Sequence, residues 1–280
     1  MDRIRICICT LIMDEHDYIE EWIDFYNKVF KINKFFLYED YFSKSHKELL
    51  AKYGDTVILT PLKDIELVDD YKQYECYPTY RQFLTILDFY KKHKDDYDYV
   101  LFIDPDEYLE RDPSIFYDEI NKYKDNKEIK YIRYQWQLMK SNGLIKKPNY
   151  KYSVVSKYCK KANDDYGDLN INFKCCFFLR HLPEGLIDKE ERYIETIPHG
   201  CACSTVNKIF KHVPLSKLRL RHYLFKSFEE YANRLYLKGE QNKRWARNIN
   251  LFFEVHKELK DKEKELLEPY KDKKVKINSI

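Results

Sequence analysis

Glycine is scarce in this sequence, with 6 residues among 280. No Gly-rich phosphate loop follows the first apolar run, residues 4–12, which argues against a nucleotidyltransferase. Long hydrophobic runs are also missing: no stretch approaches the roughly 20 apolar residues that span a bilayer, and no secretory signal is visible. We therefore expect a cytoplasmic protein without a transmembrane segment, whose contact with a membrane is peripheral at most.

An excess of charge of one sign is missing as well. The 50 Lys and Arg nearly balance the 47 Asp and Glu, which leaves a net charge of +3. A dedicated nucleic-acid-binding protein has a strongly basic face, so we expect no nucleic-acid partner.

The eight cysteines lack the spacing of a metal site or of a disulfide framework. They include Cys7 and Cys9 in a strand-like run, the adjacent pair Cys175 and Cys176, and a pair at positions 201 and 203. None of these pairs is a C-x-x-C unit with a matching second half. This pattern indicates reduced cysteines used as small apolar core residues in a reducing compartment.

Apolar runs and amphipathic segments alternate along the first half of the chain, and hydrophobic residues make up 44% of the sequence. Strands are predicted over residues 4–12, 34–40, 56–62 and 99–109, and helices over 17–30, 43–54 and 77–97. This alternation predicts an α/β fold with a mixed, mostly parallel sheet flanked by helices. Further strands are predicted over 130–139, 172–180 and 217–225, followed by a helical C-terminal extension. We predict a first domain over 1–228 and the helical extension over 229–280. The Lys/Glu-rich end of the extension should be a solvated helix face.

Polar residues end three of the predicted strands. The first strand ends near Thr10 and Glu15, the second ends at Asp40, and the fourth ends at Asp104, Asp106 and Glu107. Ligands of such sheets bind at the carboxyl ends of the strands, so these side chains should gather on one rim. Three clustered carboxylates repel one another, and a divalent cation such as Mn²⁺ or Mg²⁺ would offset that cost.

Several segments together resemble glycosyltransferases of the GT-A fold, in particular members of families 2 and 92. The resemblance covers about residues 6 to 240 and rests on "CTLIMDEHDYIEEWIDFYNKVFKINKFFLYED", "VLFIDPDEYL", "WQLMKSNG", "FKCCFFLR", "IPHG" and "RHYLFKSFEEYANRLYLKGE". The sequence departs from the family pattern at Asp14, where Asn is usual, and at Ser141-Asn142-Gly143. The resemblance implies transfer of a sugar from a nucleotide-diphosphate donor, a UDP-sugar first and a GDP-sugar second, to a hydroxyl of a glycan or glycosylated acceptor.

The resemblance also implies roles for single residues. Asp106 would bind the metal, Asp104 would contact the ribose or the metal, and Glu107 would orient the loop or touch the sugar. His222 is a candidate third metal ligand, although a lone His is often structural. Five further residues are candidates for binding the nucleotide and its diphosphate: Thr10, Glu15 and Asp40 for the base and ribose, and Lys226 with Ser227 for the diphosphate. For Glu15, helix capping is the alternative.

An inverting transferase needs a general base for the acceptor hydroxyl. The candidates are Glu184, Asp188 and His199, and the sequence does not choose among them. Two other functions stay open: a catalytically inert GT-A-like protein that binds a nucleotide or glycan, and a nucleotidyltransferase. A two-metal phosphodiesterase is disfavoured because the eight histidines are scattered.

Overall fold

The computed structural model describes residues 4–40, 44–65, 78–149, 154–162, 172–182, 213–236 and 249–271. The chain forms two compact units. The first consists of Met1–Trp136 with Ile171–Leu220, and the second of Gln137–Asn170 with Arg221–Ile280. The division predicted from the sequence, a domain over 1–228 and a helical extension over 229–280, stays a prediction.

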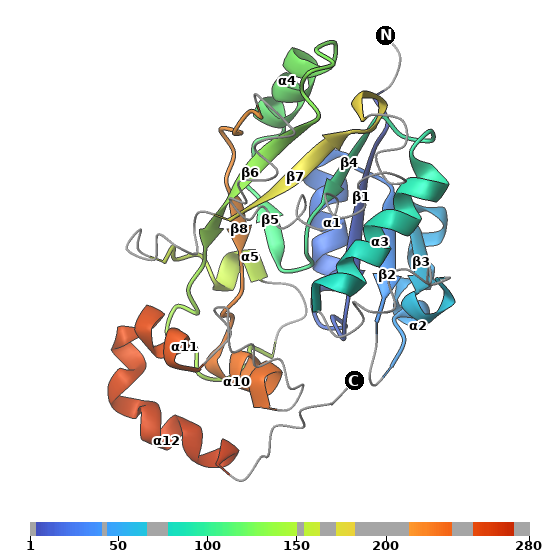
Figure 1. Ribbon diagram of the computed structural model, residues 1–280. Coiled ribbons are helices and arrows are strands. Elements are labelled where there is room, and N and C mark those ends of the chain that lie inside the picture. Colours follow the sequence, from blue (N-terminus) through green and yellow to red (C-terminus); the bar gives the residue numbers. More distant parts are fainter. Residues whose placement is uncertain are drawn as a thin grey trace. The chain divides into compact units, whose positions relative to one another are not determined.

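A mixed sheet organises the described strands in the order β3-β2-β1-β4-β7-β6-β8-β5 (Figure 1). The four strands β3, β2, β1 and β4 run parallel, whereas β7 pairs antiparallel with both β4 and β6. The predicted mostly parallel sheet with flanking helices is confirmed. The strand bounds are β1 (Ile6–Ile12), β2 (Phe35–Glu39), β3 (Val57–Pro61), β4 (Tyr99–Phe102), β5 (Glu107–Leu109), β6 (Tyr131–Leu138), β7 (Phe173–Phe178) and β8 (Leu220–His222).

Helices cover both faces of the parallel strands, which explains why β1 and β2 are apolar along almost their whole length. Helix α1 (Ile19–Phe30) lies on one face, where the ring of Trp22 meets that of Phe35 edge to face at 5.8 Å. Helix α3 (Pro78–His93) lies on the other face, and its Phe89 packs against Phe36. On the α3 face the core includes the free thiols of Cys7, Cys9 and Cys175, and Cys176 is also free and fully buried, as predicted for apolar core cysteines. For Cys159 the prediction is wrong, because this free cysteine is exposed.

Two of the predicted helices, α1 and α3, have nearly the predicted bounds. The helix predicted over 43–54 is shorter: α2 (Lys47–Leu50) passes into a 3₁₀ segment over Ala51–Thr56, which is kinked at Gly54, where φ is 51° and ψ is −132°. The remaining helices are α4 (Pro113–Tyr123), α5 (Val154–Lys157), α10 (Phe228–Tyr236), α11 (Ile249–Val255) and α12 (Glu263–Leu267).

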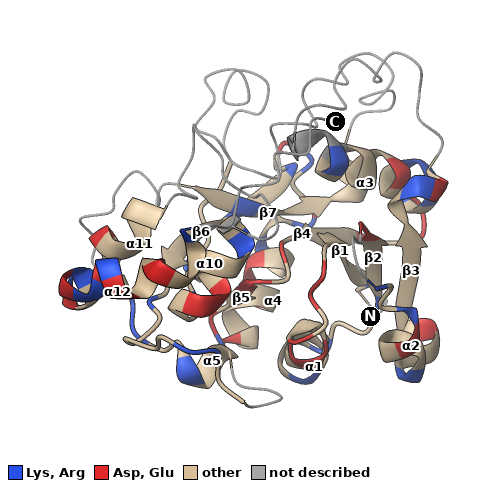
Figure 2. Ribbon diagram, turned by 90° about the horizontal axis from the view of Figure 1, so that it is seen from below, with Lys and Arg blue, Asp and Glu red and all other residues tan. Residues whose placement is uncertain are grey.

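The second unit has its own core, built largely from aromatic side chains of α10 and α11. Phe228 packs against Phe252 and Phe253 with ring centroids 5.3 and 5.7 Å apart. Acidic and basic residues are intermingled on α12 (Figure 2), as expected for a solvated helix face. None of the described helices has the length and apolarity needed to cross a membrane.

Candidate active site

The three clustered carboxylates lie in a turn rather than at the end of one long strand. The strand predicted over 99–109 is interrupted: β4 ends at Phe102 and β5 begins at Glu107. Pro105 lacks an N–H and has a fixed φ, so the strand ladder cannot continue through it. The N–H of Glu107 instead donates to the carbonyl of Asp104 at 3.0 Å and closes the turn. We call Asp104–Glu107 the acidic turn.

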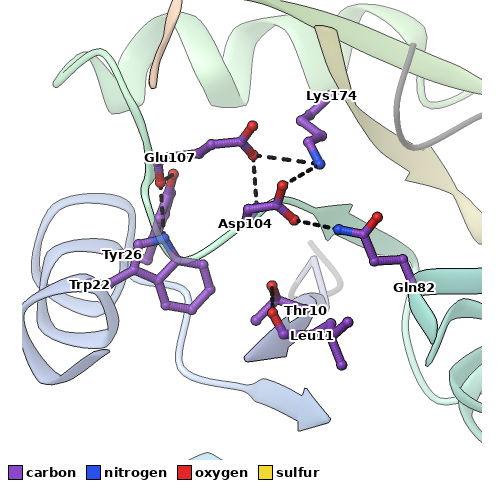
Figure 3. Close-up of polar contacts among 8 residues, drawn as sticks. All are labelled: Thr10, Leu11, Trp22, Tyr26, Gln82, Asp104, Glu107 and Lys174. Atoms are coloured by element: carbon purple, nitrogen blue, oxygen red, sulfur yellow. Dashed lines mark hydrogen bonds and ion pairs between the residues drawn. The ribbon is translucent and has the colours of Figure 1, made fainter. Parts of the chain in front are cut away.

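Helix α1 holds the acidic turn through two aromatic side chains (Figure 3). The indole Nε1 of Trp22 and the hydroxyl of Tyr26 both donate to the carbonyl of Glu107, at 2.9 and 3.1 Å. The Tyr26 hydroxyl also accepts the N–H of Leu109 at 3.0 Å. Both aromatic side chains are fully buried, so the backbone of the turn is fixed from the interior of the first unit.

A buried lysine lies beside the acidic turn. Lys174, from the otherwise apolar strand β7, is 1% exposed, and its Nζ lies 2.8 Å from Oδ2 of Asp104 and 3.9 Å from Oε2 of Glu107. Gln82 of α3 donates to the other oxygen of Asp104 at 3.3 Å (Figure 3). Lys174 therefore supplies part of the positive charge that the three carboxylates require.

The ionisation of these groups follows from their burial. Burial raises the pKa of Glu107 well above its ordinary value, and Lys174 opposes that shift only in part. Burial alone would lower the pKa of Lys174, but the carboxylates of Asp104 and Glu107 outweigh it and the pKa is raised. The ammonium of Lys174 thus stays charged at neutral pH.

The side chain of Glu107 is hydrogen-bonded within the acidic turn. Its side chain is 0% exposed, and Oε2 accepts the N–H of Asp104 at 2.7 Å. Its Oε1 is buried and has no hydrogen-bond partner in the described part of the chain. Asp106 is 4% exposed, whereas the side chain of Asp104 is 26% exposed and forms the open part of the cluster.

A small cavity adjoins the acidic turn at the carboxyl ends of β1 and β4. Its volume is about 20 Å³, which is room for one water molecule. The cavity is lined by Cys9, Thr10, Leu11, Gln82, Thr85, Ile86, Phe102, Ile103, Asp104 and Lys174. A nucleotide is far larger than this cavity, which has room for only one small group of such a ligand.

Two of the residues proposed for nucleotide binding lie at the same edge of the sheet. Thr10 lines the cavity, and the N–H of Asp40 donates to the carbonyl of Ile12 at 2.9 Å. Arg81 forms an ion pair with Asp40, and the next residue of α3, Gln82, contacts Asp104. The structure thus brings the ends of β1, β2 and β4 together along α3, as predicted.

Glu15 lies in the connection between β1 and α1. Its N–H donates to Nε2 of the fully buried His46 at 3.0 Å, and Nδ1 of that imidazole lies 2.7 Å from Oε1 of Glu39. The carbonyl of Glu15 accepts the N–H groups of Tyr18 and Ile19 at the start of α1. The backbone of Glu15 is therefore anchored, and the N-cap residue of α1 is Tyr18.

The remaining candidates belong to the second unit or lie outside the described residues. His222 is in β8, is 4% exposed, and its carbonyl accepts the N–H of Met139 at 3.0 Å. Lys226 is buried and has a positive φ of 42°. Ser227 is fully buried at the start of α10, where its hydroxyl donates to Glu230. The candidate bases Glu184, Asp188 and His199 lie outside the described residues.

The donor chemistry of the acidic turn suits a hard cation. Carboxylates are preferred ligands of Mg²⁺ and Mn²⁺, and Mg²⁺ sites often use only one or two of them and take the remaining ligands from substrate phosphates and water. Asp104 and Asp106 fit that pattern, and one buried carboxylate oxygen of Glu107 is unsatisfied beside them. Within the described residues there is no group of three His, Cys, Asp or Glu placed to hold a metal ion. A cation here would need ligands beyond the acidic turn.

Comparisons with known proteins found similarity only among solved structures. A scan against family models found no match, and a search of curated proteins found no significant one. Among solved structures, mannosyl-3-phosphoglycerate synthase from Rubrobacter xylanophilus is similar over 86% of this chain and 77% of its own, with 10% identity and a TM-score of 0.43. A putative nucleotide-diphospho-sugar transferase from Desulfovibrio desulfuricans is similar over 96% and 99%, with 11% identity and a TM-score of 0.36.

A third similar structure is glucosyl-3-phosphoglycerate synthase from Mycobacterium tuberculosis, solved with Mn²⁺, UDP and glucosyl-3-phosphoglycerate. Its identity is 13% and its TM-score 0.33 over 48% of this chain. The match spans less than half of that protein, 44% of its length. Structural similarity at this low identity and TM-score does not assign an activity, a substrate or a metal to this protein.

Proposed function

We propose that this protein transfers a sugar from a nucleotide-diphosphate donor, a UDP-sugar first, to a hydroxyl group of a glycan or glycosylated acceptor, with inversion and with Mn²⁺ or Mg²⁺. The observation that carries the proposal is the acidic turn. It follows a buried parallel strand at the carboxyl edge of the sheet, and its shape is held by Trp22, Tyr26 and Lys174. Ligands of open α/β sheets bind at this edge.

The residues of the acidic turn divide the work in this proposal. Asp106, with Asp104, would hold the cation, which when bound stabilises the negative charge of the departing diphosphate. Lys174 and Gln82 fix the two oxygens of Asp104, so that this carboxylate keeps one orientation. Glu107 holds the backbone of Asp104. The general base is proposed among Glu184, Asp188 and His199, and His222, Lys226 and Ser227 stay candidates for the metal and the diphosphate.

The charge of the cluster supports this division. Lys174 offsets one negative charge, and the raised pKa of Glu107 favours its neutral form. The carboxylates of Asp104 and Asp106 together still exceed the single charge of Lys174. A divalent cation that arrives with a diphosphate would complete the balance, whereas a diphosphate alone would be repelled.

The proposal is tested by calorimetric titration of UDP with and without Mn²⁺. We expect binding to require Mn²⁺, and Asp106→Asn to weaken the Mn²⁺-dependent affinity at least about tenfold, which is about 1.4 kcal/mol. Asp118→Asn is the matched control, because this exposed residue of α4 is not part of the site. An Mn²⁺-dependent affinity that is unchanged in Asp106→Asn would refute the metal assignment.

The reaction itself is tested by incubating the protein with a panel of nucleotide-sugars and Mn²⁺ and measuring release of the nucleotide diphosphate. Release from one donor would name that donor even without the acceptor. Binding without release from any donor, with or without added glycans, would favour the inert binding protein. Release of pyrophosphate from a nucleoside triphosphate and a sugar phosphate would favour the nucleotidyltransferase.

A further inference from the structure

A second hollow lies at the opposite edge of the parallel strands. It lies where β1, β2 and β3 begin, whereas the acidic turn lies where β4 ends. Its volume is about 450 Å³, which is within the range of about 300–1,000 Å³ that is usual for small-molecule sites. The hollow is lined by Ile4, Arg5, Ile6, Lys31, Asn33, Lys34, Asp55, Thr56, Tyr97 and Tyr117, all of the first unit.

The lining carries more positive than negative charge. Lys34 donates to the backbone carbonyl of Asp55, a neutral acceptor, and so keeps its full charge. Lys31 is exposed, and its ammonium has neither an ion pair nor a hydrogen bond with any residue the structure describes. Arg5 is already paired with Asp98 at 3.2 Å. The lining therefore holds two lysines and one arginine, against the single carboxylate of Asp55.

Neutral donors and two fixed rings complete the lining. The side chains of Asn33, Thr56 and Tyr97 have no hydrogen-bond partner in the described ranges. Burial raises the pKa of Tyr97 to about 12, so its hydroxyl stays protonated and can donate at neutral pH. The ring of Tyr97 packs edge to face on Phe36 at 5.5 Å, and the hydroxyl of Tyr117 donates to a backbone carbonyl of α1.

The backbone at Lys31 is unusual for its residue type. Lys31 ends α1 in the left-handed conformation, with φ 57° and ψ 25°. Glycine or asparagine usually occupies this position, and a residue with a longer side chain pays about 1–2 kcal/mol for it. The chain thus has a cation at the rim of the hollow in spite of a conformational cost.

We propose that this hollow binds the phosphate group of a small phosphate monoester, such as a sugar phosphate or a nucleoside monophosphate. A phosphate monoester carries between one and two negative charges at neutral pH and offers several acceptor oxygens. Lys31 and Lys34 supply compact point charges, and Asn33, Thr56 and Tyr97 supply further donors. The tyrosine rings provide apolar walls for the organic part of the ligand. The site is separate from the acidic turn and does not depend on the proposed function.

The competing explanation is that Lys31 only offsets the partial negative charge at the C-terminal end of α1. That role predicts a small loss of stability on removing the charge and no change in anion binding. Phosphate binding distinguishes the two explanations.

The test is calorimetric titration of the full chain with glucose 6-phosphate, inorganic phosphate and glucose, in EDTA. We expect both phosphates to bind, glucose not to bind, and Lys31→Gln to weaken binding about tenfold or more, the usual size of a lost charged hydrogen bond. Lys28→Gln is the matched control, because Lys28 is on the same helix, is 73% exposed, pairs with Asp24 and does not line the hollow. Absence of phosphate binding, or an equal loss in both variants, would overturn the proposal.

Chemical acetylation of the wild-type protein gives a second measurement that needs no variant. Glucose 6-phosphate should slow acetylation of Lys31 and leave Lys28 unaffected, as read by mass spectrometry. Equal protection of both lysines, or of neither, speaks against the site. The phosphate titration is also repeated with the Asp106→Asn variant. We expect unchanged phosphate binding in that variant, which distinguishes this hollow from the acidic turn.

Discussion

Replacing Lys174 by methionine should destabilise the first unit strongly, because it leaves the acidic turn without its buried cation. The Nζ lies 2.8 Å from Asp104 and the Lys174 side chain is 2% exposed. Breaking a buried ion pair by removing one partner costs about 3–5 kcal/mol. The side chain of Asp104 is 26% exposed and regains part of its hydration. We therefore expect a loss of about 2–4 kcal/mol in the free energy of unfolding at pH 7.

The assay is urea unfolding followed by circular dichroism, with Lys92→Met as the matched control. Lys92 is 55% exposed and pairs with Asp88 one helical turn away, and helix pairs at this spacing contribute about 0.3–0.5 kcal/mol. Adding Asp104→Asn to Lys174→Met should restore much of the loss, because it removes the uncompensated charge. A cost for Lys174→Met no greater than that for Lys92→Met, or no recovery in the double variant, would refute the reasoning.

Two further predictions concern Glu107 and Ser227. The pKa of Glu107 is raised in the folded protein, so its contribution to stability is present below its ordinary value near 4.5 and is lost as the pH rises through the folded value. In urea unfolding at a series of pH values, Glu107→Gln should therefore gain stability relative to wild type as the pH rises above about 4.5, and parallel curves would contradict this assignment. Ser227 and Glu230 form a capping box, in which the Ser227 hydroxyl donates to the carboxylate at 2.6 Å and accepts the Glu230 N–H at 3.3 Å. Ser227→Ala should cost about 1 kcal/mol in thermal or urea unfolding, and a loss of UDP affinity without any loss of stability would show a binding role instead.

The position of the acidic turn could be predicted from the sequence because it depends on local signals. An apolar run ending in Asp104 and Asp106, within an alternation of strands and helices, indicates the carboxyl edge of a parallel sheet. The start of α4 was readable in the same way, from Asp112 followed by a proline. The carboxylate of Asp112 accepts the N–H of Ile115 at 3.2 Å and caps the helix, which we did not predict.

The role of Lys174 could not be predicted in this way. The only local signal is a single lysine within the apolar run 173–178. What brings it to Asp104 is the antiparallel insertion of β7 beside β4, with Phe102 opposite Cys175. That pairing depends on register across more than 70 residues, which hydrophobic periodicity does not encode. For the same reason the sequence led us to a metal ion as the counter-charge of the carboxylates and did not reveal the buried ammonium.

The distant anchors of the acidic turn bear on how the protein acquires its site during folding. Hydrogen bonds from Trp22 and Tyr26 reach the turn across 85 and 81 residues, and the bond from Lys174 reaches it across 70. Contacts of such separation form slowly, because the intervening chain must first be ordered. An Asp-x-Asp peptide, or a nascent chain that ends before β7, therefore contains the acidic residues without their geometry. Ligand binding at the turn should appear only at the end of folding, which makes it a stricter measure of native protein than helical content.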